Sequence, residues 1–395
     1  MIVAWLASGL TLALLRGAPD LQPRMVAPTP GPLAQFERLR DSLAAMPHQE
    51  QSDAVRQFAE GFRGRGPLIS GEHVLFLAAG DPAAPPVLQC DLNGFAEAGS
   101  PMTRLGESDW FFREEKIPWA SRIEYRFGDG RSSWRDPLNP LRTESFPGEV
   151  SVLEGPGWSD DPADWGPPPQ GVRLLHFELA SEAMGQNRPV VVQLPAGYRV
   201  DDPGQDRLPV LYLLDGDLLL RNGYAELIGW LMEKPDGIPP CIVVYVPPVD
   251  RRNEYRGDPR HRRFITEELV PAVDRRWRTL ARADARAVLG HSRGGLGALN
   301  LALGDPLIFG RCVALSPAVN DTGLLDAIRR SAGAARRFTL VECRYDLRWR
   351  GDVALLREAL EAAGHEVTAT RINGGHNLGT WRRLLPTLVE GIWTP

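Results

Sequence analysis

The carboxyl-terminal half of the chain alternates continuous apolar runs with amphipathic segments, and this alternation restricts the fold more than any other feature. The runs LPVLYLLDGD (208–217) and PPCIVVYVPPV (239–249) are typical of strands buried on both faces of a sheet. Strands are also predicted as a hairpin at 171–181 and 188–198, and singly at 284–292, 311–319, 337–346 and 367–374. Helices are predicted at 264–277, 293–305, 353–364 and 380–393. Strands joined through helices predict an open, mostly parallel sheet in an α/β domain.

The amino-terminal half has a different pattern. Apolar residues recur at helical spacing over 33–62, which predicts one or two amphipathic helices. From His73 onward, short alternating runs separated by Gly, Pro and Asp turns predict a small β-sandwich whose strands end at Pro140. A Pro- and Gly-rich stretch near 155–171 marks a domain boundary. We therefore expect a helix-plus-sandwich domain over 33–155 and the α/β domain over 171–395.

Composition excludes several classes of function. A formal charge of −5 over 395 residues gives no sign of a nucleic-acid partner. The four cysteines are scattered without metal-ligand spacing, so neither a metal site nor a cofactor is expected. The first fifteen residues are apolar, and residues 1–22 are interpreted as a signal peptide or an uncleaved apolar helix. A signal peptide would place a bacterial protein in the periplasm or outside the cell, and otherwise it would be cytoplasmic. No stable membrane span is predicted in the body of the chain.

The segment VLGHSRGGLGALN (288–300) carries the chemistry. Gly290-His291-Ser292-Arg293-Gly294 is a G-x-S-x-G motif at the end of an apolar strand and the start of a small-residue helix. This context indicates a nucleophile elbow, a strained turn that exposes the serine Oγ, with glycines where a Cβ would collide. We therefore predict that Ser292 is the nucleophile of an acyl-transfer enzyme.

The histidine base of such a site follows the serine in sequence, and two histidines do so. His365 lies between a helix end and the start of a strand, which is the wrong edge of the sheet. His376 lies in INGGHN, just after the last strand, where loops gather over the carboxyl ends of the strands. We predict that His376 is the base.

The acid is predicted from strand position. Asp346 comes directly after the penultimate strand, so its carboxylate can accept a hydrogen bond from the Nδ1–H of His376. The competing acids are Glu342, Asp352 and Asp321.

Two further sets of residues are candidates for the site. The oxyanion hole needs two backbone N–H groups, and Arg293 supplies one. The other is expected from Asp217 or Gly216, at the end of a central strand. The loop over 247–264 carries six arginines; Arg251 and Arg252 are the predicted contacts for an anionic substrate. A solvated loop paired with its own carboxylates is the alternative for these arginines.

The ordered set of motifs resembles the enterochelin esterase family of ferric-siderophore hydrolases. The similar segments are WRDPLNP, LPVLYLLDGD, the R-x-x-E-Y type segment Arg251–Tyr255, FITEELVP, GHSRGGLGAL, the acid segment ending at Asp346, and NGGHN followed by Trp381. They cover roughly residues 70–395. The resemblance implies an α/β-hydrolase fold with a Ser292–His376–Asp346 triad, preceded by an immunoglobulin-like domain that helps to bind a catecholate ligand.

The leading hypothesis is a serine esterase acting on a small-molecule ester, such as an anionic ferric siderophore of the enterobactin type. A carbohydrate-linked feruloyl or acetyl esterase is the second hypothesis, because a β-sandwich before a hydrolase also suits polysaccharide targets. A non-catalytic binding protein of the same fold is the third.

Overall fold

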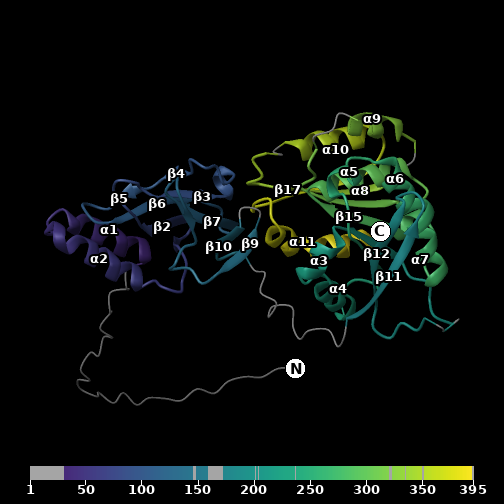
Figure 1. The fold of residues 1–395 in the computed structure, drawn as a ribbon, viewed down its shortest axis with the longest axis horizontal. Helices are drawn as coiled ribbons and strands as arrows, with labels where there is room; N and C mark the ends of the chain where they lie inside the picture. The colour runs from purple at the N-terminus through teal and green to yellow at the C-terminus, as the bar shows by residue number, and fades with distance from the viewer. Residues whose placement is uncertain are drawn as a thin grey trace, which may run out of the picture.

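A computed structural model describes residues 31–393, apart from 146–147, 159–171, 201, 203, 236, 320–322, 334 and 349–350. The apolar segment 1–22 and most of the stretch expected as a domain boundary lie outside the described residues. Figure 1 shows a smaller β domain with two helices on the left and a larger α/β domain on the right.

The β domain opens with two helices, α1 (Pro32–Leu43) and α2 (His48–Glu60). Both turn an apolar side toward one face of a sheet, where Phe36, Val55 and Ala59 are buried with Leu75 and Trp110. This packing explains the helical spacing of apolar residues in the segment.

Two antiparallel sheets form the rest of this domain. One has the order β1-β2-β6-β5. The other has the order β4-β3-β7-β10-β9, and β8 pairs with β7. The bounds of these strands are β1 Leu68–Ser70, β2 His73–Ala79, β3 Val87–Cys90, β4 Ser100–Pro101, β5 Thr103–Arg104, β6 Trp110–Lys116, β7 Arg122–Gly128, β8 Ser133–Trp134, β9 Arg142–Ser145 and β10 Gly148–Glu154. A single 3-10 turn, η1 (Asp91–Asn93), follows β3.

The expectation that the strands end at Pro140 was wrong. Strands β9 and β10 follow Pro140, and β10 pairs antiparallel with β7 in the middle of the second sheet. The segment GEVSVLE holds only three apolar side chains, too weak a pattern to stand out. Those three, Val150, Val152 and Leu153, are nevertheless buried.

The α/β domain is built on an eight-stranded sheet with the order β11-β12-β14-β13-β15-β16-β17-β18. The first two strands form an antiparallel hairpin, and the strands from β14 to β18 run parallel to one another. The bounds are β11 Arg173–Ser181, β12 Gln186–Leu194, β13 Val210–Leu214, β14 Ile242–Val246, β15 Arg286–His291, β16 Arg311–Leu315, β17 Arg337–Cys343 and β18 Glu366–Ile372. Strands β13, β14 and β15 are buried throughout, as expected of a sheet covered on both faces.

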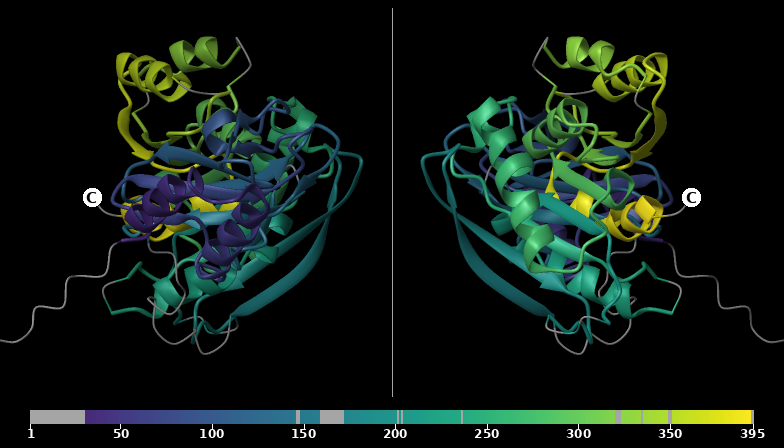
Figure 2. Two further views of the ribbon diagram at one scale, coloured as in Figure 1. Left: turned by 90° about the vertical axis from the view of Figure 1, so that its left-hand side faces the viewer. Right: turned by 90° about the vertical axis from the view of Figure 1, so that its right-hand side faces the viewer.

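Helices cover both faces of this sheet (Figure 2). One hydrophobic cluster joins the sheet to α7, α8, α9 and α10, and a second joins the opposite face to α3, α4 and α11. The helix bounds are α3 Gly216–Arg221, α4 Tyr224–Glu233, α5 Arg251–Glu254, α6 Pro259–Arg263, α7 Val270–Arg276, α8 Arg293–Gly304, α9 Gly323–Arg330, α10 Asp352–Ala362 and α11 Leu378–Trp393. The predicted helix at 264–277 begins with π-helical turns over Phe264–Leu269 before α7.

All four cysteines are buried as free thiols, and burial raises the pKa of each. Three of them, Cys90, Cys312 and Cys343, lie in strands. Among the described residues, no helix has the length and apolar character that spanning a bilayer requires.

Candidate active site

Ser292 occupies a sharp turn between β15 and α8. Its backbone has φ 54° and ψ −118°, a conformation that a residue with a side chain rarely adopts. The flanking glycines make the turn possible, because a Cβ on Gly290 would lie 2.1 Å from the carbonyl oxygen of Gly294. The elbow therefore has the strained geometry that the G-x-S-x-G motif predicts.

The structure brings the three residues predicted as a triad into one hydrogen-bonded chain. His376 Nε2 lies 2.8 Å from Ser292 Oγ, and His376 Nδ1 lies 2.5 Å from Asp346 Oδ2. Asp346 follows β17 and is 4% exposed, whereas His376 stands in the loop between β18 and α11. A buried carboxylate on Nδ1 leaves Nε2 free to accept a proton from the serine.

The competing residues are held elsewhere. Glu342 lies within β17, where it pairs with Arg371 and accepts a hydrogen bond from the backbone of Gly351. Asp352 opens α10. His365 is buried at the far end of β18, with its Nε2 2.7 Å from Ser331 Oγ. Asp321 lies outside the described residues.

A second histidine lies beneath the elbow. His291, the residue before the nucleophile, is buried with its Nε2 3.0 Å from the hydroxyl of Tyr224. Burial, assisted by Arg251 and His376, lowers its pKa to about 3. The neutral ring packs against Trp381, whose own ring meets His376 edge-on at 4.8 Å. The rings of His291 and Trp381 thus pack beneath Ser292 and His376.

Two helix N-termini supply the candidate oxyanion donors. Arg293 is the first residue of α8, after which the Leu296 N–H makes the first turn's hydrogen bond to Ser292 O. In α3, the first such bond runs from Leu219 N to Asp215 O, so Gly216 and Asp217 precede it. Backbone N–H groups in a first helical turn have no carbonyl partner inside the helix and can serve an oxyanion.

The arginines of the 247–264 loop do not act as one group. Arg251 donates from Nε and Nη2 to the two carboxylate oxygens of Asp215, at 2.6 and 2.8 Å, so its guanidinium group is already engaged by the protein. Arg252 is exposed on α5. Burial lowers the pKa of Arg293, and the positive charges of four nearby arginines lower it further. These arginines are Arg251, Arg252, Arg256 and Arg348.

A cleft of about 1020 Å³ opens over Ser292 and His376, and both domains line it. The β domain contributes residues from β7, β9 and β10, and the α/β domain contributes residues from α3, α5, α11 and the histidine loop. Five arginines are among the lining residues: Arg122, Arg142, Arg221, Arg251 and Arg382. Arg252 does not line this cleft.

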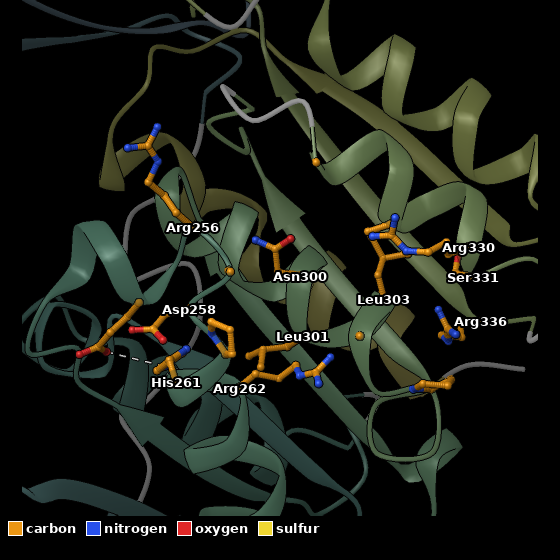
Figure 3. Close-up of a pocket in the computed structure, with 18 of the residues that line it drawn as sticks. Arg256, Asp258, His261, Arg262, Asn300, Leu301, Leu303, Arg330, Ser331 and Arg336 are labelled. Atoms are coloured by element: carbon orange, nitrogen blue, oxygen red, sulfur yellow. Dashed lines mark ion pairs between the residues drawn. The ribbon is translucent and has the colours of Figure 1, made fainter. Parts of the chain in front are cut away.

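Two other arginines of the loop, Arg256 and Arg262, face another cavity, shown in Figure 3. This cavity measures about 630 Å³ and lies between the 254–262 segment, α8 and α9. Arg256 and Arg262 line it together with Arg330 and Arg336, whereas the three triad residues do not. Two of the six arginines in the loop therefore line a cavity other than the one over Ser292.

Sequence reasoning missed a buried polar cluster beside the histidine loop. Arg122 and Glu124 of β7 form an ion pair at 2.8 Å. Arg122 also donates to the side-chain oxygen of Asn377, and the backbone N–H of Glu124 donates to the carboxylate of Asp91. Burial, together with the charge of Glu124, raises the pKa of Asp91 to about 8. The available signal was the strand SRIEYRFGDG, in which charged residues alternate with apolar ones although both faces are buried.

The comparisons with known proteins agree with this geometry. The family model described as "Putative esterase" matches residues 181–349. The chain is 30% identical to the uncharacterized protein YjcH of Bacillus subtilis over 41% of this chain and 69% of that protein. The chain belongs to this esterase family. Membership identifies it as a carboxylic ester hydrolase and confirms the resemblance that the motifs indicated.

Other known proteins are similar to this chain over a larger share of its length. The iron(III) enterobactin esterase of Escherichia coli K12 is 24% identical over 71% of this chain and 73% of its own length. The ferric enterobactin esterase structure from Salmonella typhimurium superimposes with a TM-score of 0.66 at 19% identity, covering 81% of this chain and 93% of that one. Across four curated relatives the match spans 59% to 73% of the relative's length. The fold is thus an α/β-hydrolase preceded by a β domain.

Proposed function

We propose that this esterase hydrolyses a carboxylic ester of a catecholate siderophore through a Ser–His–Asp acyl-enzyme mechanism. One observation carries the proposal. Ser292, His376 and Asp346 are joined by hydrogen bonds. Ser292 and His376 line a large cleft to which both domains contribute and which five arginines also line.

The mechanism follows from the hydrogen bonds. Neutral His376 accepts the proton of Ser292 through Nε2 while Oγ attacks the ester carbonyl. Asp346 stabilises the resulting imidazolium by accepting a hydrogen bond from Nδ1–H. The oxyanion accepts hydrogen bonds from the backbone N–H groups of Arg293 and Asp217. His376 then protonates the leaving alcohol, and an activated water hydrolyses the acyl-enzyme by the same steps.

The charge of the cleft supports an anionic substrate. The arginines outnumber the carboxylates there, because Glu124, Glu144 and Glu154 are its only acidic residues within the described part of the chain. A ferric tris-catecholate is a bulky anion, and a cleft of about 1020 Å³ offers room for one. We also propose that the β domain is immunoglobulin-like and forms the outer wall for this ligand, because residues of β7, β9 and β10 line the cleft.

A feruloyl ester of a polysaccharide is the second candidate. It is favoured by a 28% identical relative from Xylanibacter ruminicola that is named endo-1,4-beta-xylanase/feruloyl esterase, matched over 30% of that protein. Feruloyl groups attached to neutral sugars offer little for the arginines of the cleft to bind. The charge of the cleft therefore places this candidate second.

The experiment compares rates on enterobactin, its ferric complex and a feruloyl ester, using the full chain and Ser292→Ala. A value of kcat/KM at least tenfold higher for a siderophore, abolished in Ser292→Ala, supports the proposal. A preference for the feruloyl ester would assign the substrate to the second class. A failure of a fluorophosphonate probe to label Ser292 would overturn the mechanism itself.

A further inference from the structure

The loop that carries His376 makes several polar contacts with the other domain. Asn377, the next residue, accepts a hydrogen bond from Arg122 Nη1 at 2.8 Å. Its amide nitrogen lies 3.3 Å from Asp91 Oδ2. Arg122 and Asp91 belong to the β domain, on β7 and on the turn after β3. The side chain of Asn377 thus contacts two residues of the β domain, one through its oxygen and one through its nitrogen.

The backbone of the loop is held by the same strand. The N–H of Arg122 donates to the carbonyl of Asn373 at 2.9 Å, and Arg122 forms a parallel bridge with Gly374. The N–H of Tyr345, next to the acid Asp346, donates in turn to Gly374 O at 3.1 Å. A single backbone bridge therefore joins the first residue of β7 to the loop after β18, at the point where the base and acid loops meet.

Close packing leaves the loop little freedom. A Cβ on Gly375 would lie 2.0 Å from Oδ1 of Asp91, and a Cβ on Gly379 would lie 2.4 Å from Cζ of Arg122. Asp91, Arg122 and Asn377 are each at most 7% exposed. Gly375, directly before His376, and Gly379, three residues after it, thus allow the β domain to approach the loop that carries the base.

Tyr345 adds a contact on the acid side. Its hydroxyl lies 3.1 Å from Ser121 Oγ, and its ring is part of the hydrophobic core of the β domain. Both loops that deliver triad residues after the serine are therefore anchored on the β domain. The serine itself stands on β15 and α8, within the α/β domain.

We infer that the β domain is part of the catalytic apparatus, with Arg122 and Asp91 acting as positioning residues that hold His376 at hydrogen-bonding distance from Ser292. This inference rests on the proposed serine mechanism. A positioning role differs from a substrate-binding role. It makes the β domain necessary even for the hydrolysis of small esters that are too short to contact that domain. A displacement of about 1 Å at a base can lower a rate about 10²-fold.

The test uses p-nitrophenyl acetate with the full chain. Arg122→Gln is expected to lower kcat about 10- to 100-fold while KM changes less than about threefold. Arg126→Gln is the matched control, because Arg126 lies on the same strand but donates to Gln89 within the β domain. Its kcat is expected to stay within about twofold of the parent.

A second variant guards against misfolding. Loss of Arg122 alone leaves Glu124 buried without its cation, and a buried charge without a partner destabilises a fold. The double variant Arg122→Met/Glu124→Gln removes both charges together and is expected to show the same kcat loss with a parent-like thermal midpoint. Hydrogen exchange of residues 373–378 is expected to rise in both variants and to remain unchanged in Arg126→Gln.

The outcomes separate two failures. If parent Ser292 reacts with a fluorophosphonate and Arg122→Gln reacts equally fast with unchanged exchange of the loop, the positioning inference is wrong while the proposed mechanism stands. If KM alone rises, and only for siderophore esters, Arg122 contacts substrate and the inference is also wrong. If parent Ser292 does not react, the proposed mechanism fails, and loop exchange still decides whether the β domain holds the loop.

Discussion

Arg251 and Asp215 form a two-point ion pair near Ser292, with the carboxylate buried and the guanidinium group at the edge of the cleft. Asp215 has φ 59° and immediately precedes α3, so it fixes the turn that presents the N–H of Asp217. A Cβ on Gly294 would lie 2.7 Å from the Oδ2 atom of Asp215, so the carboxylate also packs tightly against the elbow. The arginine that sequence analysis assigned to the substrate is thus paired with the residue that precedes α3, the helix that carries the proposed oxyanion donor Asp217.

Replacing Arg251 tests this assignment. Arg251→Gln leaves Asp215 buried without its cation and should lower the free energy of unfolding by about 1–3 kcal/mol. Arg252→Gln, on the same helix, should change it by no more than about 0.5 kcal/mol, because Arg252 is exposed. Urea titration of both variants measures the difference. If the two variants were equally stable, Arg251 would instead be assigned as a substrate contact.

Removal of the nucleophile should separate fold from activity. Ser292→Ala is expected to lower kcat by about 10⁴–10⁶ because a triad without its serine retains only oxyanion and binding contributions. The thermal midpoint should stay close to that of the parent. Retention of more than a tenth of the ester hydrolysis would show that another group is the nucleophile.

The acid is tested by comparing aspartates. Asp346→Asn should lower kcat about 10³–10⁴-fold, since an amide favours the wrong imidazole tautomer and does not stabilise the imidazolium. Asp352→Asn and Asp321→Asn should each cost less than about tenfold. If Asp321→Asn lost activity while Asp346→Asn kept it, the acid would be Asp321 and not Asp346.

Stability should decrease with rising pH because of Asp91. Burial raises the pKa of this carboxyl to about 8, above its value in the unfolded chain, so the folded state holds the proton longer. Between about pH 4 and pH 8 the unfolded state binds fewer protons than the folded state, and stability falls across that window. Asp91→Asn cannot titrate and should show a shallower decline of the thermal midpoint. A steeper decline in the variant would contradict the raised pKa.

A methyl group at Gly375 tests the contact between the domains. Gly375→Ala places its Cβ against the Asp91 carboxyl and should lower the free energy of unfolding by about 1–3 kcal/mol. Gly391→Ala is the matched control, because nothing lies within 4 Å of its Cβ and it stands in helix α11. The control should be neutral or slightly stabilising. Equilibrium denaturation of both variants gives the comparison.

Sequence reasoning succeeded where the physics is local. The strained turn at Ser292 needs glycines at fixed offsets, and strands buried on both faces need unbroken apolar runs, so both leave a pattern in neighbouring residues. The placement of His376 and Asp346 followed from a single rule, that parallel strands deliver their carboxyl ends to one edge. These inferences needed no knowledge of the other domain.

The remainder depends on contacts between distant segments. Nothing near Arg251 in sequence shows that its partner is Asp215, 36 positions earlier. Asn377 lies 255 positions from Arg122, and its importance emerges only when the domains are packed together. The loop arginines looked alike in sequence, yet Arg251 lines the cleft over Ser292 whereas Arg256 and Arg262 line the second cavity.

The four buried thiols give the chain an experimental advantage. Thiolates are the species that react with maleimides and iodoacetamides, and these cysteines are shielded from solvent with their pKa values raised. A cysteine introduced on the exposed surface of α1 and another on α10 could therefore carry fluorophores without first removing the native ones. Energy transfer between such dyes would report whether the two domains part and rejoin during turnover.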